Sequence, residues 1–213
     1  MNVIRDSGNG FRVKTEDSNI LLFVGALFRH PNHDTRNPSK NMQDKFPDIK
    51  LLVFDVDGVF SDGGIILSDV GIETKRYNVR DGFGVVAARK MGIEVGILTG
   101  RANRNVTLRM RELGIPHVVS KCTHKGEGIE RVAKLYDIPL ENIAYLGDDL
   151  IDLPAMTRVA YPMAVADAEE PVKAHAKYIT TQPGGHGAVR DAINHVLEKL
   201  GRYDELVQMY LEM

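Results

Sequence analysis

Apolar runs of strand length alternate with segments of helical period from residue 49 onward. The apolar runs predict strands at residues 51–54, 93–98, 117–119 and 143–146, and short strands near Ala160 and Tyr178. The helical spacing predicts helices at residues 82–91, 102–113, 125–136, 150–156 and 187–200. Helices that return the chain between strands give parallel pairs, so this pattern predicts an α/β fold with a doubly wound parallel sheet of Rossmann-like topology.

The segment 63–77 departs from this alternation. Two short β-prone runs flank a turn that contains Asp69 and Gly71, which predicts a hairpin beside the end of the first strand. Such a hairpin is either a flap over a site at that edge or a surface feature without a role.

The two ends of the chain lack a strong pattern. Residues 29–48 are polar, contain prolines and show no periodicity, so we expect residues 1–48 to be a poorly ordered extension. Residues 49–202 are expected to form the folded domain. The weakly amphipathic tail 203–213 either packs on a neighbouring subunit or frays.

The composition excludes several classes of partner. A chain of 213 residues with 43% hydrophobic residues can bury one substantial core. A net charge of −2 with scattered basic residues makes nucleic acid a poor partner. The apolar segment 20–28 is too short to span a bilayer, so we expect no signal peptide and no membrane partner. The one cysteine, Cys122, cannot form an internal disulfide, which fits a reducing cytoplasm.

Two carboxylates follow the first predicted strand directly. Ligands of open α/β sheets bind at the carboxyl ends of strands, and Asp55 and Asp57 fall there. Their spacing places both side chains on one side of the backbone, so a cation or a shared proton is needed to relieve the repulsion. A divalent metal is the natural choice. The alternative is turn chemistry alone, with an aspartate capping the backbone and Gly58 supplying a positive φ.

A possible oxyanion site follows the next strands. Thr99, Gly100 and Arg101 offer a hydroxyl, a close backbone and a guanidinium, a set that suits phosphate. The alternative is a helix N-cap at Thr99. Lys125 opens the helix after the third strand, where its charge could neutralise both phosphate and carboxylates, although lysines at surface helix starts are common.

A second group of acids follows the strand at residues 143–146. It contains Asp148, Asp149 and Asp152, and acids at this position also cap helices. For Asp148, directly after the strand, metal ligation is the better interpretation. Mg²⁺ prefers hard oxygen ligands and is usually held by one or two carboxylates together with substrate phosphate. Asp55 and Asp148 meet that requirement.

The order of these motifs resembles the haloacid dehalogenase superfamily of phosphotransferases. The resemblance implies that Asp55 is the nucleophile that forms an aspartyl-phosphate, and that Asp57 protonates the leaving group and then activates water. It implies that Thr99 and Lys125 hold the phosphoryl oxygens. Metal ligands implied by the resemblance are Asp55, the carbonyl of Asp57 and Asp148, with Asp149 or Asp152 in support.

The spacing between motifs leaves no room for a large cap domain. The chain therefore resembles the capless branch, whose subunits close one another's active sites in homotetramers. Within it, residues 49–200 are similar to phosphatases of a phosphorylated eight-carbon keto-sugar acid in lipopolysaccharide synthesis. Guanidinium groups suit the carboxylate of such a substrate. The implied substrate contacts are Asp57, Asn78, Arg80, Asp81, Gly82, Gly100, Arg101, Arg109 and Lys125.

Two positions differ from that family's pattern. Val86 stands where we associate a substrate-contacting arginine with the family, and His186 stands in the glycine loop where arginine is common. A nine-carbon nonulosonate 9-phosphate therefore stays open as an alternative substrate. A receiver domain has a different motif order and no counterpart of Asp57. A catalytically silent oligomerisation domain is the remaining alternative, against which the intact motifs argue.

Overall fold

The computed structural model describes residues 3–6, 10–13 and 45–213, which fall into two units divided after Gln43. In the first unit, β1 (Val3–Asp6) pairs antiparallel with β2 (Gly10–Val13). The expectation for residues 14–44 lies outside the described residues. In the second unit, the ring of Phe46 packs against Tyr161 with centroids 4.7 Å apart, so chain contacts with the domain begin shortly before residue 49.

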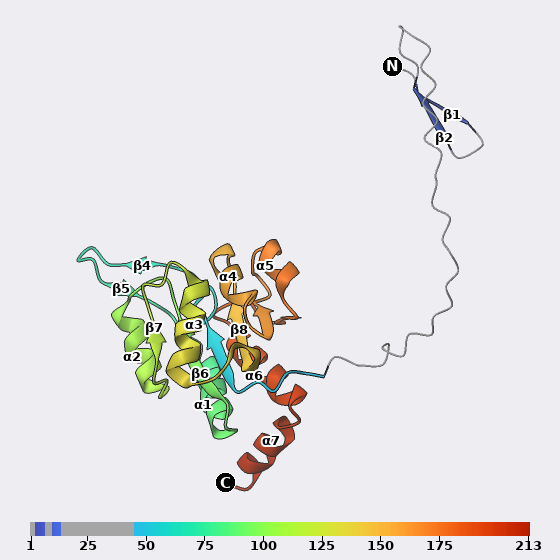
Figure 1. Cartoon of the computed structure of the whole chain (residues 1–213). Coiled ribbons are helices and arrows are strands. Elements are labelled where there is room, and N and C mark those ends of the chain that lie inside the picture. Colours follow the sequence, from blue (N-terminus) through green and yellow to red (C-terminus); the bar gives the residue numbers. More distant parts are fainter. Residues whose placement is uncertain (1–2, 7–9, 14–44) are drawn as a thin grey trace. The chain divides into compact units, whose positions relative to one another are not determined.

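A six-stranded parallel sheet forms the centre of the second unit (Figure 1). Its strands are β3 (Leu51–Phe54), β6 (Glu94–Leu98), β7 (Val118–Val119), β8 (Ile143–Gly147), β9 (Tyr161–Ala164) and β10 (Tyr178–Ile179). They lie in the order β10-β9-β8-β3-β6-β7. The chain runs outward from β3 on both sides, which confirms the predicted doubly wound fold. The strand order reverses between β3 and β8, the place where such sheets bind ligands.

Helices cover both faces of this sheet. They are α1 (Val79–Lys90), α2 (Arg104–Glu112), α3 (Lys125–Tyr136), α4 (Leu153–Met156), α5 (Glu170–His175), α6 (Ala188–Lys199) and α7 (Tyr203–Leu211). Two 3₁₀ turns, η1 (Leu140–Asn142) and η2 (Leu150–Asp152), flank β8. Helix α6 contacts both α1 and α7, and α3 packs on α4. Among the described helices, none has the length and apolar character to cross a membrane.

One helix begins earlier than predicted, and two further helices were not predicted. Helix α1 begins at Val79, earlier than predicted, because Asn78 Oδ1 accepts a hydrogen bond from the N–H of Arg80 at 2.8 Å and caps the helix. Helix α5 has only six residues, too few to show a helical period. The tail forms α7, and its Leu206 is buried within the chain's own core.

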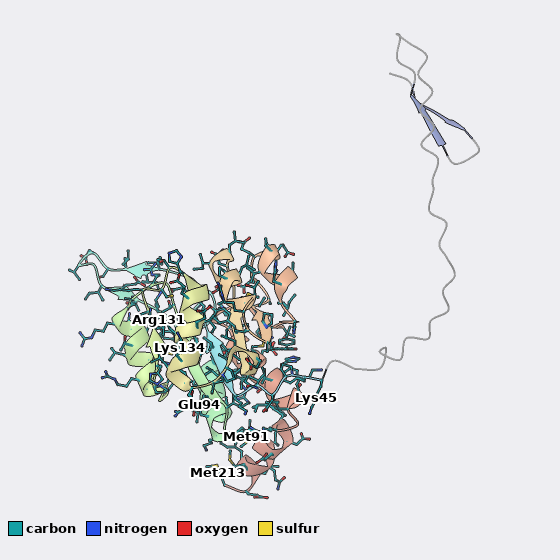
Figure 2. All side chains as sticks on the ribbon, viewed as in Figure 1. Lys45, Met91, Glu94, Arg131, Lys134 and Met213 are labelled. Carbon is teal, nitrogen blue, oxygen red and sulfur yellow. The ribbon has the colours of Figure 1, made fainter. Side chains whose placement is uncertain are left out.

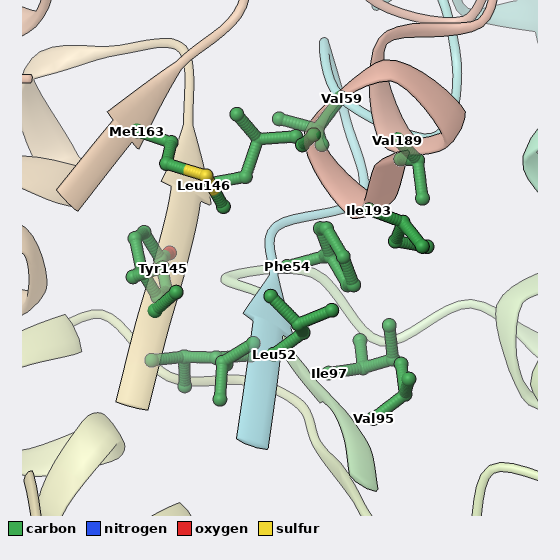
Figure 3. Packing of buried hydrophobic residues seen from close by; sticks show 14 of the residues in the cluster. Leu52, Phe54, Val59, Val95, Ile97, Tyr145, Leu146, Met163, Val189 and Ile193 are labelled. Atoms are coloured by element: carbon green, nitrogen blue, oxygen red, sulfur yellow. The ribbon is translucent and has the colours of Figure 1, made fainter. Parts of the chain in front are cut away.

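The core holds the end of β3 in place. Leu52 and Phe54 of β3 contribute to one buried cluster with Ile97 of β6, Leu146 of β8 and Ile193 of α6 (Figure 3). All four residues of β3 are buried, as expected for a central strand covered on both faces. The side chains that surround this core are drawn in Figure 2. The loop that follows β3 is therefore anchored by a fully buried central strand.

The hairpin predicted at residues 63–77 is present and extends away from the sheet (Figure 1). It contains β4 (Ile66–Leu67) and β5 (Glu73–Thr74), which pair antiparallel. Its apolar side chains face solvent in this chain, with Val70 75% exposed. The described residues contain no large cap between β3 and β6.

Candidate active site

A fully buried lysine lies at the edge of the sheet where the carboxyl ends of the strands meet. Lys125, the first residue of α3, places Nζ 2.9 Å from Asp55 Oδ2 and 2.5 Å from Asp152 Oδ1. Burial works against the charged ammonium, but the two carboxylates outweigh it and hold the pKa of Lys125 above its usual value. The lysine thus joins the end of β3 to the turn after β8.

Asp152 is saturated by donors. Its Oδ1 accepts the hydroxyl of Tyr145 at 2.6 Å in addition to Lys125, and its Oδ2 accepts the backbone N–H groups of Asp148 and Asp149 at 3.0 and 3.2 Å. These bonds orient the loop that carries Asp148. Asp152 therefore supports the site rather than offering a free oxygen to a ligand.

Two neighbouring carboxylate oxygens have no partner. Asp55 Oδ1 and Asp148 Oδ1 are buried, and neither forms a hydrogen bond among the described residues. Oxygens of Asp55, Asp148 and Asp152 all lie within 4.8 Å of one another. Unpaired buried carboxylate oxygens are costly, and hard oxygen donors this close fit a divalent cation such as Mg²⁺. We call Asp55, Lys125, Tyr145, Asp148 and Asp152 the sheet cluster.

The protonation of this cluster reflects crowding. Burial, followed by the Asp152 and Asp55 charges, raises the pKa of Asp148 to about 8. Burial also raises the pKa of Asp55 to about 7, although Lys125 opposes that shift. A bound cation would favour both ionised forms, so the pair is arranged to exchange protons for metal.

Glycines allow the site loops to approach closely. Gly58 has a φ of 85°, and a Cβ there would lie 2.0 Å from Asp148 Oδ2. Behind it, Gly184 packs so tightly that a Cβ would lie 1.8 Å from the carbonyl oxygen of Gly58, and the N–H of Gly185 donates to Val59 at 2.9 Å. The glycine loop therefore supports the turn that follows Asp55.

Asp57 lies on the hairpin side of the same edge and is partly exposed. Its carboxylate pairs with Lys75 at the end of β5, and Arg101 Nε lies 3.9 Å from its Oδ2. Sequence reasoning missed Lys75 and its neighbour Glu73. The alternation Glu73-Thr74-Lys75, which places both charges on one side of a strand, is the signal that could have found them.

The predicted phosphate ligand Thr99 directly follows β6, the strand next to β3 in the sheet. Its side chain is 1% exposed, and its Oγ1 accepts the N–H of Arg101 at 3.3 Å. Gly100 is half-buried and Arg101 is exposed. Thr99 and Arg101 thus lie at the edge that carries Asp55, while their contacts with a phosphate stay a prediction.

The side chains of Asp149 and Asp81 each accept a hydrogen bond from a backbone N–H group. Asp149 is exposed, and its Oδ1 accepts the N–H of Leu150 at 2.6 Å, so its role as a metal ligand stays a prediction. Asp81 is fully buried and accepts the N–H of Arg190 at 2.8 Å, which caps α6 from α1. Burial raises the pKa of Asp81 to about 6. Its Oδ2 has no hydrogen-bond partner among the described residues, and its contact with substrate stays a prediction.

The remaining predicted substrate contacts lie around α1. Arg109 of α2 reaches over Gly82, where a Cβ would lie 2.3 Å from Arg109 Nη2. Arg80 is exposed and lines a groove of about 450 Å³ with Val79, Phe83 and Arg190. Among the described residues, no hydrogen bond or ion pair joins Asn78, Arg80 or Arg109 to the sheet cluster.

The two divergent positions are both on the surface. Val86 is 37% exposed on α1. His186 is exposed, with Nδ1 2.8 Å from the carbonyl oxygen of Gly184 and Nε2 3.5 Å from Arg76. Neither touches the sheet cluster.

Residues 112–193 match the profile of haloacid dehalogenase-like hydrolases. The chain is 42% identical over 167 residues to 3-deoxy-D-manno-octulosonate 8-phosphate phosphatase of Escherichia coli, covering 78% of this chain and 89% of the relative.

Solved structures agree. The chain is similar to the Moraxella catarrhalis 3-deoxy-D-manno-octulosonate 8-phosphate phosphatase in complex with magnesium, phosphate and the sugar acid, with a TM-score of 0.75, 38% identity, and coverage of 78% of this chain and 95% of that one. It is also similar to the cobalt-bound Haemophilus influenzae phosphatase, with a TM-score of 0.72, 33% identity, and coverage of 75% and 93%.

Proposed function

We propose a residue-level mechanism for this chain, which belongs to the 3-deoxy-D-manno-octulosonate 8-phosphate phosphatases among the haloacid dehalogenase-like hydrolases. The chain is a phosphatase that hydrolyses this phosphomonoester to the free sugar acid and phosphate, with Mg²⁺ as cofactor. One observation carries the mechanism: Asp55 presents a buried, unpaired oxygen at the end of the central strand while Lys125 holds its other oxygen.

In the first half-reaction, the carboxylate of Asp55 attacks phosphorus and the bond from phosphorus to the sugar oxygen breaks. Asp57 gives a proton to that oxygen as it leaves. Lys125 and Thr99 supply positive charge and a hydroxyl to the phosphoryl oxygens, because phosphoryl transfer depends mainly on positioning and charge stabilisation. Asp55, Asp148 and the carbonyl of Asp57 would hold Mg²⁺, which would neutralise charge on the phosphate.

In the second half-reaction, water attacks the aspartyl-phosphate. Asp57, now without its proton, accepts one from the water as the bond between Asp55 and phosphorus breaks. Phosphate leaves and Asp57 is protonated again for the next cycle. The same residue therefore serves as acid and as base, and its partly exposed position between the sheet and the hairpin suits both steps.

The test is release of inorganic phosphate from 3-deoxy-D-manno-octulosonate 8-phosphate and from a nonulosonate 9-phosphate, with and without Mg²⁺. We expect metal-dependent turnover with preference for the eight-carbon substrate. The variant Asp55→Asn should lose at least roughly 10⁴-fold in kcat, as expected when a nucleophile is removed. Turnover that survives in Asp55→Asn would contradict the mechanism, and absence of turnover on both sugars would contradict the substrate.

We also propose that the chain forms a homotetramer in which neighbouring subunits help to close the active sites. The support is the hairpin, where Ile66, Leu67 and Val70 are 59%, 63% and 75% exposed although they are apolar. Exposed apolar surface of this kind typically marks an interface. A chain without a large cap also needs another element to shield its site from water.

Light scattering of the purified protein tests the assembly. Val70→Glu should produce smaller species and a lower kcat, whereas Leu211→Glu, at an equally exposed position on α7, should leave the assembly intact. Tetramers of Val70→Glu with unchanged mass would contradict the proposed interface. A cytoplasmic location and the absence of nucleic-acid and membrane partners stay predictions.

A further inference from the structure

Two lysines of the site each pair with two carboxylates. Lys125 pairs with Asp55 and Asp152, and Lys75 pairs with Asp57 and Glu73. The side chain of Lys75 has no exposed surface, like that of Lys125. Lys75, however, comes from the hairpin and not from the sheet, and it contacts the residue that moves protons rather than the nucleophile.

Lys75 is one of four charged side chains of alternating sign that form a closed ring. Its Nζ pairs with Asp57 Oδ1 and lies 3.1 Å from Glu73 Oε1. Arg101 Nη2 lies 2.6 Å from Glu73 Oε2, and Arg101 Nε lies 3.9 Å from Asp57 Oδ2. We call Asp57, Glu73, Lys75 and Arg101 the hairpin ring. Oδ1 of Asp57 is therefore occupied by Lys75. Its Oδ2 is left open, because the 3.9 Å distance to Arg101 is too long for a hydrogen bond.

The ring is also held from helix α2. Asn105 of α2 donates from Nδ2 to the carbonyl oxygen of Glu73 at 2.5 Å. This bond holds the end of β5 beside α2, whereas the exposed pair of Arg76 with Asp62 lies outside the ring. Ordering a lysine side chain costs conformational entropy, so two carboxylate partners are needed to keep Lys75 in one position.

We propose that Lys75 is a positioning residue for proton transfer: it holds Asp57 through Oδ1 so that Oδ2 faces the bridging oxygen of the ester. The inference rests on the proposed function and deepens it. The proton moves from Oδ2 to the bridging oxygen as the bond from phosphorus to that oxygen breaks and the bond to Asp55 forms. Later Oδ2 takes a proton from the attacking water as the bond to Asp55 breaks. Lys75 keeps its own protons throughout.

Leaving groups of different basicity test this role. A sugar alkoxide must be protonated as it leaves, whereas p-nitrophenolate leaves without a proton. With enzyme in excess over substrate and Mg²⁺ present, Lys75→Met should slow single-turnover release of the sugar acid about 10²-fold, the usual contribution of acid catalysis. Release of p-nitrophenol from p-nitrophenyl phosphate should fall only a few-fold. Lys75→Arg should recover much of the lost rate.

Controls separate positioning from folding. Arg76→Met removes the neighbouring hairpin ion pair without touching Asp57 and should leave both rates unchanged. Glu73→Gln keeps Lys75 but weakens its second contact. It should therefore slow release of the sugar acid more than release of p-nitrophenol, by a smaller factor than Lys75→Met. This variant replaces Lys75→Met if the latter does not fold.

Equal losses for both leaving groups, or an equal loss in Arg76→Met, would overturn the role of Lys75. A wild-type protein that releases p-nitrophenol but not the sugar acid would instead contradict the proposed substrate. The Lys75 comparison would then use an alkyl phosphate that the wild type does hydrolyse.

Discussion

The sheet cluster and the hairpin ring each place a lysine between two carboxylates, but the fold holds them differently. In the sheet cluster, Lys125 and both of its carboxylate partners are 5% exposed or less. In the hairpin ring, Lys75 is buried while Asp57 and Arg101 are 25% and 46% exposed. The first group is anchored by central strands and the second by a strand of two residues. The nucleophile is therefore held rigidly, and the proton-transfer residue depends on an element that can be perturbed separately.

The largest expected difference is in stability. Lys125→Met leaves two buried carboxylates without their cation, which should cost about 3–5 kcal/mol of unfolding free energy. Lys75→Met leaves carboxylates that water reaches, so we expect roughly half of that loss. Urea unfolding at one protein concentration without metal would measure both. Equal losses would show that the two groups of carboxylates are equally desolvated, which would contradict the difference in burial between the sheet cluster and the hairpin ring.

A glycine substitution tests the close packing of the sheet cluster. Gly58→Ala drives a Cβ into Asp148, so Mg²⁺ affinity should fall at least about tenfold, as expected when a ligand's support is disturbed. Gly71→Ala is the matched control, because its φ of 75° is also positive but a Cβ there meets nothing within 4 Å. Calorimetric titration with Mg²⁺ would show unchanged affinity in the control. Equal weakening in both would assign the effect to backbone strain alone.

The sheet cluster was largely predictable from sequence and the hairpin ring was not. Asp55 and Asp148 each follow a buried apolar strand, and parallel strands end at one edge, so their proximity follows from the hydrophobic pattern. Lys75 lies in a hairpin whose register depends on turn geometry, which two-residue strands specify weakly. The pairing of Lys125 with Asp152 could not be foreseen either. Several acids lie in the same turn, and the backbone geometry decides which of them caps the helix and which pairs with the lysine.

The raised pKa values of the sheet cluster should make the stability of the metal-free protein depend on pH. The pKa of Asp148 is raised to about 8 and that of Asp55 to about 7, above the unfolded values near 4. A raised carboxyl pKa gives stability that is fully present below pH 4 or so and is lost as pH rises through the folded values. The metal-free protein should therefore lose several degrees of Tm between roughly pH 5 and pH 9.

Mg²⁺ should reverse that loss, because the cation takes the place of the protons. Thermal melts in chelator and in excess Mg²⁺ across this range would show the largest stabilisation by metal at the alkaline end. Asp148→Asn removes one of the two titrating groups and should flatten the profile in chelator. A metal effect that is equal at all pH values would contradict the exchange of protons for metal.

The smallest effect is expected at the outer edge of the hairpin, and it defines where the hairpin ring ends. Arg76 follows Lys75 directly, but its side chain is 66% exposed and its partner is Asp62. Exposed pairs of this kind contribute about 0–1 kcal/mol, so Arg76→Met should shift the urea midpoint slightly and leave kcat unchanged. The two residues that follow β5 would then differ sharply, because the extended backbone sends the lysine into the site and the next side chain, the arginine, into solvent. A large loss of kcat in Arg76→Met would extend the ring through Asp62 to the loop after Asp57, and proton transfer would then depend on the whole base of the hairpin rather than on Lys75.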